Sequence, residues 1–221
     1  GAGPAGSSAA YHLATCGLDV IVVERHELGR DKVCGDGLTP SAVRELVSMG
    51  MDTTGWQRNR GLRVIGGGHL LHFPWPEQAS FPSYGMARPR ALLDRDLAEH
   101  AAAAGARLLT GVTVTAPVTS PTGRVTGVEA RPTNRVAYPG IEGPTTFTAP
   151  LVVDAGGVSA RLATAVGRTK NERRPMGVAV RAYFRSPRAK DAWMESRLEL
   201  WDGTPGKSDL LPGYGWIWSV G

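Results

Sequence analysis

The sequence predicts an α/β fold in which a Rossmann-like, three-layer nucleotide-binding domain is interleaved with a β-rich domain. Two observations carry this prediction. The chain opens with GAGPAG, and an Ala/Ser-rich segment and a continuous apolar run follow it, as expected for a turn, a helix and a buried parallel strand. From Met176 onward the residues instead alternate or run apolar in short stretches, which is typical of strands.

The opening turn has the spacing Gly1-x-Gly3-x-x-Gly6, with Ala2, Pro4 and Ala5 at the remaining positions. In such a turn the first glycine permits the tight bend, the second lets a pyrophosphate approach the backbone, and the third lets helix and strand pack closely. The alternative is an ordinary glycine-rich turn. The elements that follow favour a dinucleotide site.

A helix is expected over residues 7–16, with Gly17 as its natural end. The strand that follows, residues 18–24, ends in Glu24, which lies 18 residues after Gly6. An acid at this place accepts hydrogen bonds from a ribose in dinucleotide-binding folds.

Further elements follow in order. Thr39 and Pro40 predict the N-cap and first residue of a helix that extends to Gly50. A second helix is expected over residues 90–104, with leucines and alanines on one face. The remaining expected elements are strands at 61–66, 69–75, 106–118, 123–131, 145–157, 177–184, 196–201 and 214–220, and a short helix at 159–166.

These elements predict two discontinuous domains. The nucleotide-binding domain takes residues 1–50 and 88–168, and the β-rich, substrate-binding region takes 51–87 and 169–221. A ligand is expected near their junction, because pockets favour such places. The chain starts without a methionine and ends directly after a strand-like run, so we expect a fragment truncated at both ends.

Composition excludes several classes of protein. The net charge is +5, but the basic residues are scattered and no nucleic-acid-binding module is present, so we expect no nucleic acid partner. No apolar run is long enough for a membrane span. The only cysteines, Cys16 and Cys34, have no CxxC or zinc-site spacing, so we expect no metal and a reducing, cytoplasmic setting.

Cys34 lies in the glycine-rich stretch DKVCGDGLTP. Metal-ligand and disulfide roles have no partner residues in the sequence pattern. Two interpretations stay open: a reactive thiol that donates or relays a proton, and a small residue that only packs in a tight turn.

Four stretches together resemble a known family. GAGPAGSSAAYHLATCGLDVIVVER resembles the FAD-binding segment of flavoproteins grouped with p-hydroxybenzoate hydroxylase. KVCGDGLTP and LLPGYGWIW resemble the geranylgeranyl reductases within that group, which saturate isoprenoid double bonds. The region from SFPSYG to RALLDRDLAEHAAAAGA is similar to actinobacterial members that act on the prenyl tail of menaquinone.

The resemblance implies FAD as cofactor and assigns residues to it. The turn glycines would bind the pyrophosphate and Glu24 the ribose, with Arg25 near the adenine. Arg90 would contact the FAD phosphates or ribose, the alternative being a solvated arginine at a helix start. The loop of Cys34 and Gly35 would face the flavin ring, with Cys34 as the candidate catalytic residue.

Two positions depart from the family pattern. The second nucleotide motif, expected as Ala-Asp-Gly, reads Ala-Gly156-Gly157, so a glycine stands where the acid belongs. The C-terminal segment has Trp-Ser in place of the usual Phe-Pro. Tyr214 and Trp216 are kept at a spacing of two. The resemblance makes them prenyl-binding residues, and the alternative is that their aromatic rings are only core.

The resemblance implies an FAD-dependent oxidoreductase that reduces isolated C=C bonds of an isoprenoid, with NAD(P)H or another electron donor. One alternative is an FAD-dependent monooxygenase or halogenase on the same fold, and another is that this polypeptide alone binds no FAD. We expect a prenyl lipid or quinone substrate and a transient, peripheral contact with the inner face of the membrane. The substrate, the donor and the oligomeric state stay open at this point.

Overall fold

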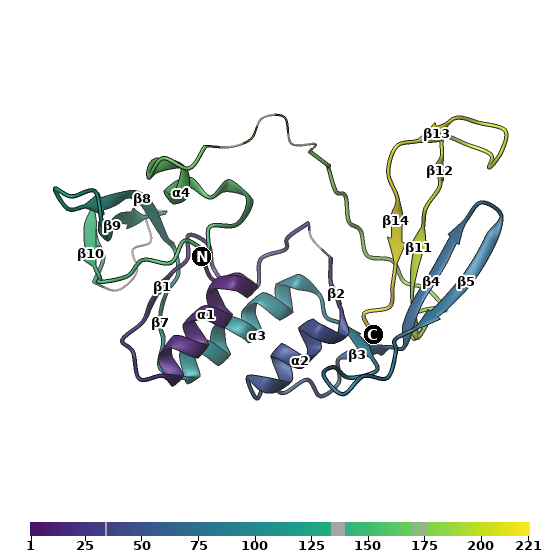
Figure 1. Cartoon of the computed structure of the whole chain (residues 1–221), viewed down its shortest axis with the longest axis horizontal. Helices are drawn as coiled ribbons and strands as arrows, with labels where there is room; N and C mark the ends of the chain where they lie inside the picture. Colours follow the sequence, from purple (N-terminus) through teal and green to yellow (C-terminus); the bar gives the residue numbers. More distant parts are fainter. Residues whose placement is uncertain (34, 134–139, 170, 172, 174–175) are drawn as a thin grey trace. The chain divides into compact units, whose positions relative to one another are not determined.

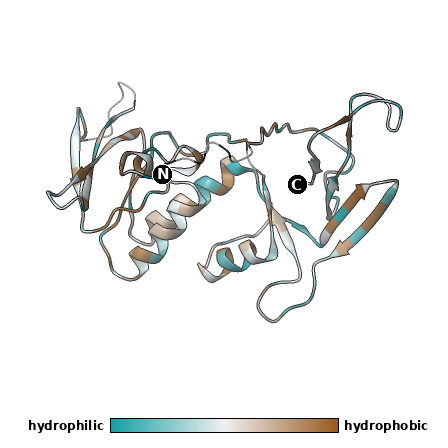
Figure 2. Cartoon of the chain, turned by 45° about the horizontal axis from the view of Figure 1, so that its top comes forward, coloured by the Kyte–Doolittle hydropathy of each residue, from teal (hydrophilic) through white to brown (hydrophobic). Residues whose placement is uncertain are grey.

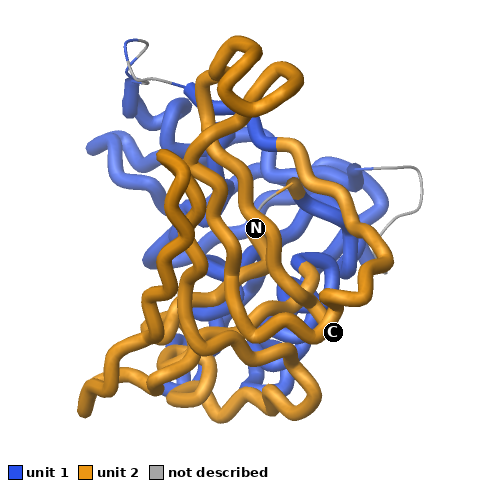
Figure 3. Tube along the Cα trace, turned by 90° about the vertical axis from the view of Figure 1, so that its right-hand side faces the viewer, with its two compact units in different colours: residues 1–32, 90–179 blue, residues 33–89, 180–221 orange. Residues whose placement is uncertain are grey.

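The computed structural model describes residues 1–33, 35–133, 140–169, 171, 173 and 176–221 (Figure 1). The chain divides into two compact units, each made of two separate segments (Figure 3). Unit 1 contains Gly1–Lys32 and Arg90–Ala179, and unit 2 contains Val33–Pro89 and Val180–Gly221. The mixed α/β class expected from the sequence is confirmed, and each unit is described separately below.

The centre of unit 1 is a helix pair packed beside a parallel strand pair. Helices α1 (Pro4–Thr15) and α3 (Arg90–Ala103) pack on each other, and β1 (Ile21–Val23) pairs in parallel with β7 (Arg107–Leu109). Small residues form this core and allow the helices to approach closely. They are Ala2, Ala10, Val22, Ala98, Ala101 and Ala106.

The helix ends in unit 1 follow the glycines. Gly17 comes directly after the C-cap of α1 with φ +79°, and Gly105 follows α3 with φ +109°. Only glycine adopts such angles without strain, so both chain reversals are encoded locally. Helix α1 begins three residues earlier than expected, because Pro4 already suits the first helical position.

The rest of unit 1 is an antiparallel sheet and a short helical segment. Strand β9 (Val125–Pro132) lies between β8 (Val112–Thr119) and β10 (Thr145–Thr148). A 3₁₀ turn, η1 (Gly157–Ser159), then leads into α4 (Arg161–Ala165). Residues 149–155 continue without strand pairing, so the strand expected over residues 145–157 is shorter than predicted.

Unit 2 begins with a small sheet and one helix. Strand β6 (Gly85–Ala87) lies between β2 (Gly37–Leu38) and β3 (Gln57–Asn59), and α2 (Pro40–Ser48) packs against β6. Thr39 is the N-cap and Pro40 the first helical residue, as expected. Buried apolar residues accompany this arrangement: Val43, Leu46, Met49, Met51, Trp56, Met86 and Ala87.

A four-stranded sheet forms the larger part of unit 2. Its order is β14 (Gly215–Ile217), β11 (Trp193–Arg197), β4 (Gly61–Gly66) and β5 (His69–Pro74). Strands β11 and β4 are parallel, and the two outer pairings are antiparallel. A separate short pair joins β12 (Leu200–Trp201) to β13 (Leu210–Leu211).

The register of this sheet separates two faces, because directly paired residues point to the same side. The first, which we call the apolar face, includes Leu62, Val64, Leu71, Phe73, Met194 and Trp216, with Ser196 among them. The second, which we call the charged face, includes Arg63, His72, Glu195 and Arg197, together with Ile65, Leu70 and Ile217. Hydrophobic stretches are visible along the paired strands of the β4–β5 hairpin (Figure 2).

Two expectations differ from the structure. Residues 177–184 were expected to form a strand but have no strand pairing, and Val178 and Val180 are almost fully exposed. Alternating apolar residues suit a strand only when a partner strand lies beside them, and the described residues supply none here. Residues 33–50, predicted to belong to the first domain, pack within unit 2 because β2 and α2 both contact β6.

Candidate nucleotide and substrate sites

The glycine turn at the start of unit 1 is shaped by close backbone approaches. A Cβ atom at Gly6 would overlap the carbonyl oxygen of Gly1, and one at Gly1 would lie 2.7 Å from the carbonyl oxygen of Ala155. Gly3 differs, since a Cβ there would meet only the Lys32 ammonium, at 3.6 Å. Gly1 and Gly6 are therefore required by packing, whereas Gly3 leaves space open between α1 and a positive charge.

Glu24 follows β1 and faces the same turn. One carboxylate oxygen accepts the Ala2 N–H at 2.8 Å and the other accepts the His26 N–H at 3.0 Å. Burial alone would raise the pKa of Glu24, but these two backbone donors outweigh it and the pKa is lowered. The carboxylate is thus ionised at neutral pH, and its remaining lone pairs can accept ribose hydroxyls.

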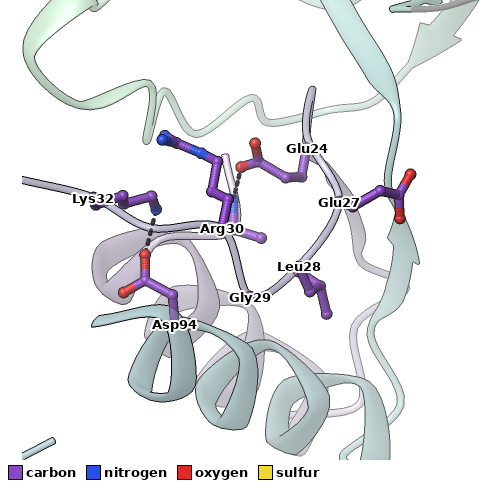
Figure 4. Close-up of a pocket in the computed structure, with 8 residues that line it drawn as sticks. Glu24, Glu27, Leu28, Gly29, Arg30, Lys32 and Asp94 are labelled. Atoms are coloured by element: carbon purple, nitrogen blue, oxygen red, sulfur yellow. Dashed lines mark hydrogen bonds and ion pairs between the residues drawn. The ribbon is translucent and has the colours of Figure 1, made fainter. Parts of the chain in front are cut away.

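Two cations share one carboxylate beside this turn. The Lys32 ammonium is ion-paired with Asp94 on α3 (Figure 4). Arg90, one helical turn earlier, donates to the same carboxylate through Nε at 2.9 Å. Arg90 is 8% exposed, so it is not the solvated arginine that the sequence left as an alternative. The three groups carry one net positive charge at the rim of the nucleotide pocket.

The residues of this pocket fit the pyrophosphate and ribose of FAD. The N-terminus of α1 presents backbone N–H groups with a partial positive charge, and Lys32 adds a full charge above Gly3. Ser7, which follows the turn, is buried, and its hydroxyl has no hydrogen-bond partner among the described residues. The pocket is lined by Ala2, Glu24, Glu27, Leu28, Gly29, Arg30, Lys32 and Asp94.

The second glycine motif lies against the first. Ala155 approaches both Gly1 and Gly6, so the fold brings the Gly156–Gly157 turn to the nucleotide turn. Asp154 does not replace the missing acid, because its carboxylate accepts the N–H groups of Gly156 and Ala163, each at 2.8 Å. Its role in the structure is to brace η1 and the start of α4.

The turn after Cys34 lies in unit 2. Cys34 itself is outside the described residues, while Gly35 and Gly37 are described. A Cβ at Gly35 would lie 3.8 Å from the Trp218 ring, and one at Gly37 would overlap the end of the Met194 side chain. Because Met194 belongs to the apolar face, this turn adjoins that face.

Tyr214 and Trp216 are the aromatic residues predicted to bind substrate. Their rings meet edge to face with centroids 6.4 Å apart, and Trp216 and Trp218 are 6.1 Å apart. Tyr214 is 65% exposed and Trp216 41% exposed, so neither ring is core in the described chain. Trp216 belongs to the apolar face, as do Phe73 and Leu71, which are about half exposed.

Several residues of these sites were missed by sequence reasoning. Asp94 could have been found, because it follows Arg90 at the i,i+4 spacing of helix ion pairs. Lys32 and Met194 carry no local signal, since each reaches its place from a separate element. Arg25, predicted to lie near the adenine, directly follows Glu24 and is exposed. Lys32 lies nearer than Arg25 to the glycine turn, beside Gly3.

Two features are absent from the described part of the chain. No helix there is long and apolar enough to cross a membrane. Within the same residues, no group of three or more His, Cys, Asp or Glu side chains is placed to hold a metal ion.

Comparisons with known proteins agree with this geometry. The family model described as an FAD binding domain matches residues 1–212. The menaquinone reductase of Mycolicibacterium smegmatis is 41% identical over 225 residues, covering 100% of this chain and 51% of that protein. The chain thus spans about half the length of the curated relatives that match it throughout.

Two solved structures share the fold. A geranylgeranyl bacteriochlorophyll reductase-like protein from Thermoplasma acidophilum superposes with a TM-score of 0.70 and 20% identity, over 100% of this chain and 52% of that one. A myxobacterial chondrochloren halogenase gives 0.70 and 20%, over 98% and 48%. At this identity the likeness concerns the fold alone. The match to residues 1–212 decides the family: the chain belongs to the FAD binding domain family.

Proposed function

We propose that the protein is an FAD-dependent oxidoreductase that saturates isolated double bonds in the prenyl chain of a quinone or related lipid. The observation that carries the proposal is the apolar face of unit 2, which adjoins the Gly35–Gly37 turn through Met194. Similarity to a menaquinone reductase over the whole chain supports the same substrate class.

The apolar face suits a prenyl chain because its exposed part is aliphatic and aromatic. Leu71, Phe73 and Trp216 remain 41–51% exposed, which leaves broad hydrocarbon and ring surfaces for an isoprenoid to cover. The opposite side of the same sheet also exposes Leu70 and Ile217, but there they are mixed with the charged Arg63, Glu195 and Arg197. Desolvating those charges is costly, so the apolar face is the better surface for hydrocarbon.

At the other site, unit 1 would hold the cofactor. The α1 N-terminus and Lys32 would neutralise the pyrophosphate, Arg90 would support Lys32 through Asp94, and Glu24 would accept the ribose hydroxyls. Arg25 and the Gly156–Gly157 turn remain proposed contacts for the adenine and for the remainder of the cofactor.

Reduced FAD, when bound, would supply a hydride to one alkene carbon and thereby lose two electrons. NAD(P)H or another donor would return the cofactor to its reduced form. The second alkene carbon needs a proton. We propose the Cys34 thiol as its source, with Gly35 leaving the backbone beside it unobstructed. The apolar face would orient the chain and exclude water from the reacting bond.

The test uses the complete protein with FAD, a chemical reductant and a prenylated menaquinone. The expected product gains two hydrogens per reduced bond, detected by mass spectrometry. Trp216→Ala should raise KM roughly 10- to 30-fold, because a large ring contact is lost. Ile217→Ala is the matched control: Ile217 is equally exposed but faces the opposite side, so its KM should not change.

Two results would contradict the proposal. One is a hydroxylated or halogenated product formed with oxygen, which would assign the protein to the alternative reaction class. The other is an equal effect of the two variants on KM, which would remove the apolar face from the substrate site.

A further inference from the structure

The Gly35–Gly37 turn must be held in one conformation although two of its three residues are glycines. Glycines at both positions fit beside Trp218 and Met194, but they also make the unfolded turn unusually free. A segment with so little side chain needs some other constraint to hold one conformation. The residue between the glycines, Asp36, is 1% exposed and provides that constraint.

The Asp36 carboxylate is held by two residues from the other segment of unit 2. Arg181 Nη1 donates to one oxygen at 2.6 Å, and the Tyr183 hydroxyl donates to the other at 3.0 Å. The Arg181 guanidinium also lies over the Tyr183 ring, 4.6 Å from its centroid. Burial, together with the hydrogen bond to Asp36, raises the pKa of Tyr183, so the phenol remains a donor.

The backbone of the turn is fixed from another side. The Arg88 N–H donates to the Asp36 carbonyl at 2.9 Å, and Gly37 pairs with Ala87 in the β2–β6 ladder. The turn is thus tied to β6 through its main chain and to residues 181–183 through its one side chain. The main-chain contacts fix the path of the turn, and the contacts of the Asp36 side chain fix its rotation about that path.

A buried ion pair of this kind is weak evidence for stability. Desolvating both charges offsets most of their attraction, and an apolar replacement is often as stable. The cost is better explained by conformational specificity, since the pair accepts only one placement of Asp36. Placement matters most where a turn borders a proposed reaction site.

We propose that Asp36, with Arg181 and Tyr183, is a positioning residue for the reduction: it sets the conformation of the Gly35–Gly37 turn beside the apolar face. Asp36 does not contact the substrate in this proposal, which rests on the proposed function. Its effect passes through the backbone of the turn.

The test compares Asp36→Asn with Glu195→Gln in the complete protein. Glu195 is a matched control, because it is another buried carboxylate of unit 2, paired with Arg63, Arg188 and Arg197 near the charged face. Asp36→Asn should lower kcat about tenfold or more with little change in KM or bound FAD, since misplacing a reacting group slows chemistry more than binding. Glu195→Gln should lower Tm comparably but leave kcat unchanged.

Hydrogen exchange gives a second readout that does not depend on turnover. The peptide that contains residues 35–38 should exchange at least severalfold faster in Asp36→Asn and not in Glu195→Gln. Unchanged exchange in Asp36→Asn overturns the inference, and so does a loss of kcat that merely follows Tm in both variants. If the wild type reduces no prenyl chain, the proposed function fails, while the exchange result still decides the positioning role.

If Asp36→Asn does not fold, Tyr183→Phe replaces it. This variant removes one hydrogen bond and keeps the Arg181 ion pair. It should lower kcat a few fold and speed exchange in the same peptide. Wild-type values for both measurements would overturn the proposal.

Discussion

The molecule contains two glycine-rich turns that are held in different ways. The turn from Gly1 to Gly6 in unit 1 is fixed by its own backbone and by Ala155, and its glycines are needed because backbone atoms lie where side chains would be. The Gly35–Gly37 turn in unit 2 is fixed by the side chain of Asp36, whose partners come from 145 and 147 residues away. One turn is held by close backbone contacts, and the other by the ion pair and hydrogen bond of one side chain.

The contrast between the two turns shows which kind of turn can be recognised from a sequence motif. A turn fixed by backbone packing needs glycines at the same spacing in every protein that contains it. The spacing can therefore be recognised in the sequence. A turn fixed by a distant ion pair needs only a small, free segment, and such segments are common in loops.

The largest effect is expected at Gly6. Gly6→Ala places a Cβ on the Gly1 carbonyl, and backbone cannot move aside as a side chain can. We expect loss of FAD binding and of about 3 kcal/mol or more in stability. Gly3→Ala is the control, because its φ of −80° suits alanine and its Cβ would meet only Lys32. It should keep the wild-type Tm and still weaken FAD binding, measured by flavin absorbance after dialysis.

Acid should affect unit 2 through its ion pairs. The hydrogen bond from Arg63 holds the pKa of Asp191 well below its usual range, while for Glu195 burial would raise the pKa but the arginines outweigh it and lower it. A carboxylate with a lowered folded pKa contributes its full stability above the unfolded values, 3.8 and 4.5. That stability is lost as the pH falls below them.

This loss is measured as Tm between pH 7 and pH 3, followed by tryptophan fluorescence. Asp191→Asn should lower Tm at pH 7 and flatten the decline toward acid. A decline as steep as that of the wild type would show that other carboxylates control the acid response.

A smaller effect is expected from Lys32→Met, which keeps the aliphatic stem and removes the charge above Gly3. FAD affinity should fall about 10- to 100-fold, because a charge-assisted contact is worth about 1.5–3 kcal/mol. The difference in FAD affinity between the wild type and Lys32→Met should shrink at high salt, because salt screens the charge of Lys32. Arg107→Met, which removes a charge from an exposed pair with Asp19, is the control and should leave the FAD Kd unchanged. Equal Kd values for the wild type and Lys32→Met would exclude Lys32 from the cofactor site.

The smallest effect is expected at Gly37. Gly37→Ala overlaps only the end of the flexible Met194 side chain, so we expect about 1 kcal/mol of destabilisation. Met194→Ala in the same chain should recover part of this loss, as measured by a double-mutant cycle in urea. A cost that Met194→Ala does not relieve would mean that backbone, rather than Met194, limits the turn.

The parts of the fold that the sequence predicted are those with local causes. Pro40 and Thr39 start α2, and the glycines after α1 and α3 end those helices, because each depends on its own φ angle. The strand expected at 177–184 failed because alternation specifies a face but supplies no partner strand. The domain cut near residue 50 failed to anticipate β2, a two-residue strand too short to carry any periodic signal.

The candidate sites divide in the same way. The nucleotide turn and Glu24 could be read from spacing, and Arg90 from the pattern of its helix. Lys32 could not, because it pairs with Asp94 across 62 residues. The apolar face could not be read either, since it follows from a register that joins β4 to β11 across the chain.

That register has a consequence for how the chain is made. The parallel pairing of β4 with β11 joins Arg63 to Glu195, 132 residues apart, and the longer segment of unit 1, Arg90–Ala179, lies between them in sequence. Parallel pairing over such a separation is slow, because a long loop must close before any contact rewards it. On the ribosome, the β4–β5 hairpin is therefore synthesised long before its partner, and the edge of β4 that pairs with β11 stays open until then. Unit 2 is the part of the molecule for which a chaperone would matter most during synthesis.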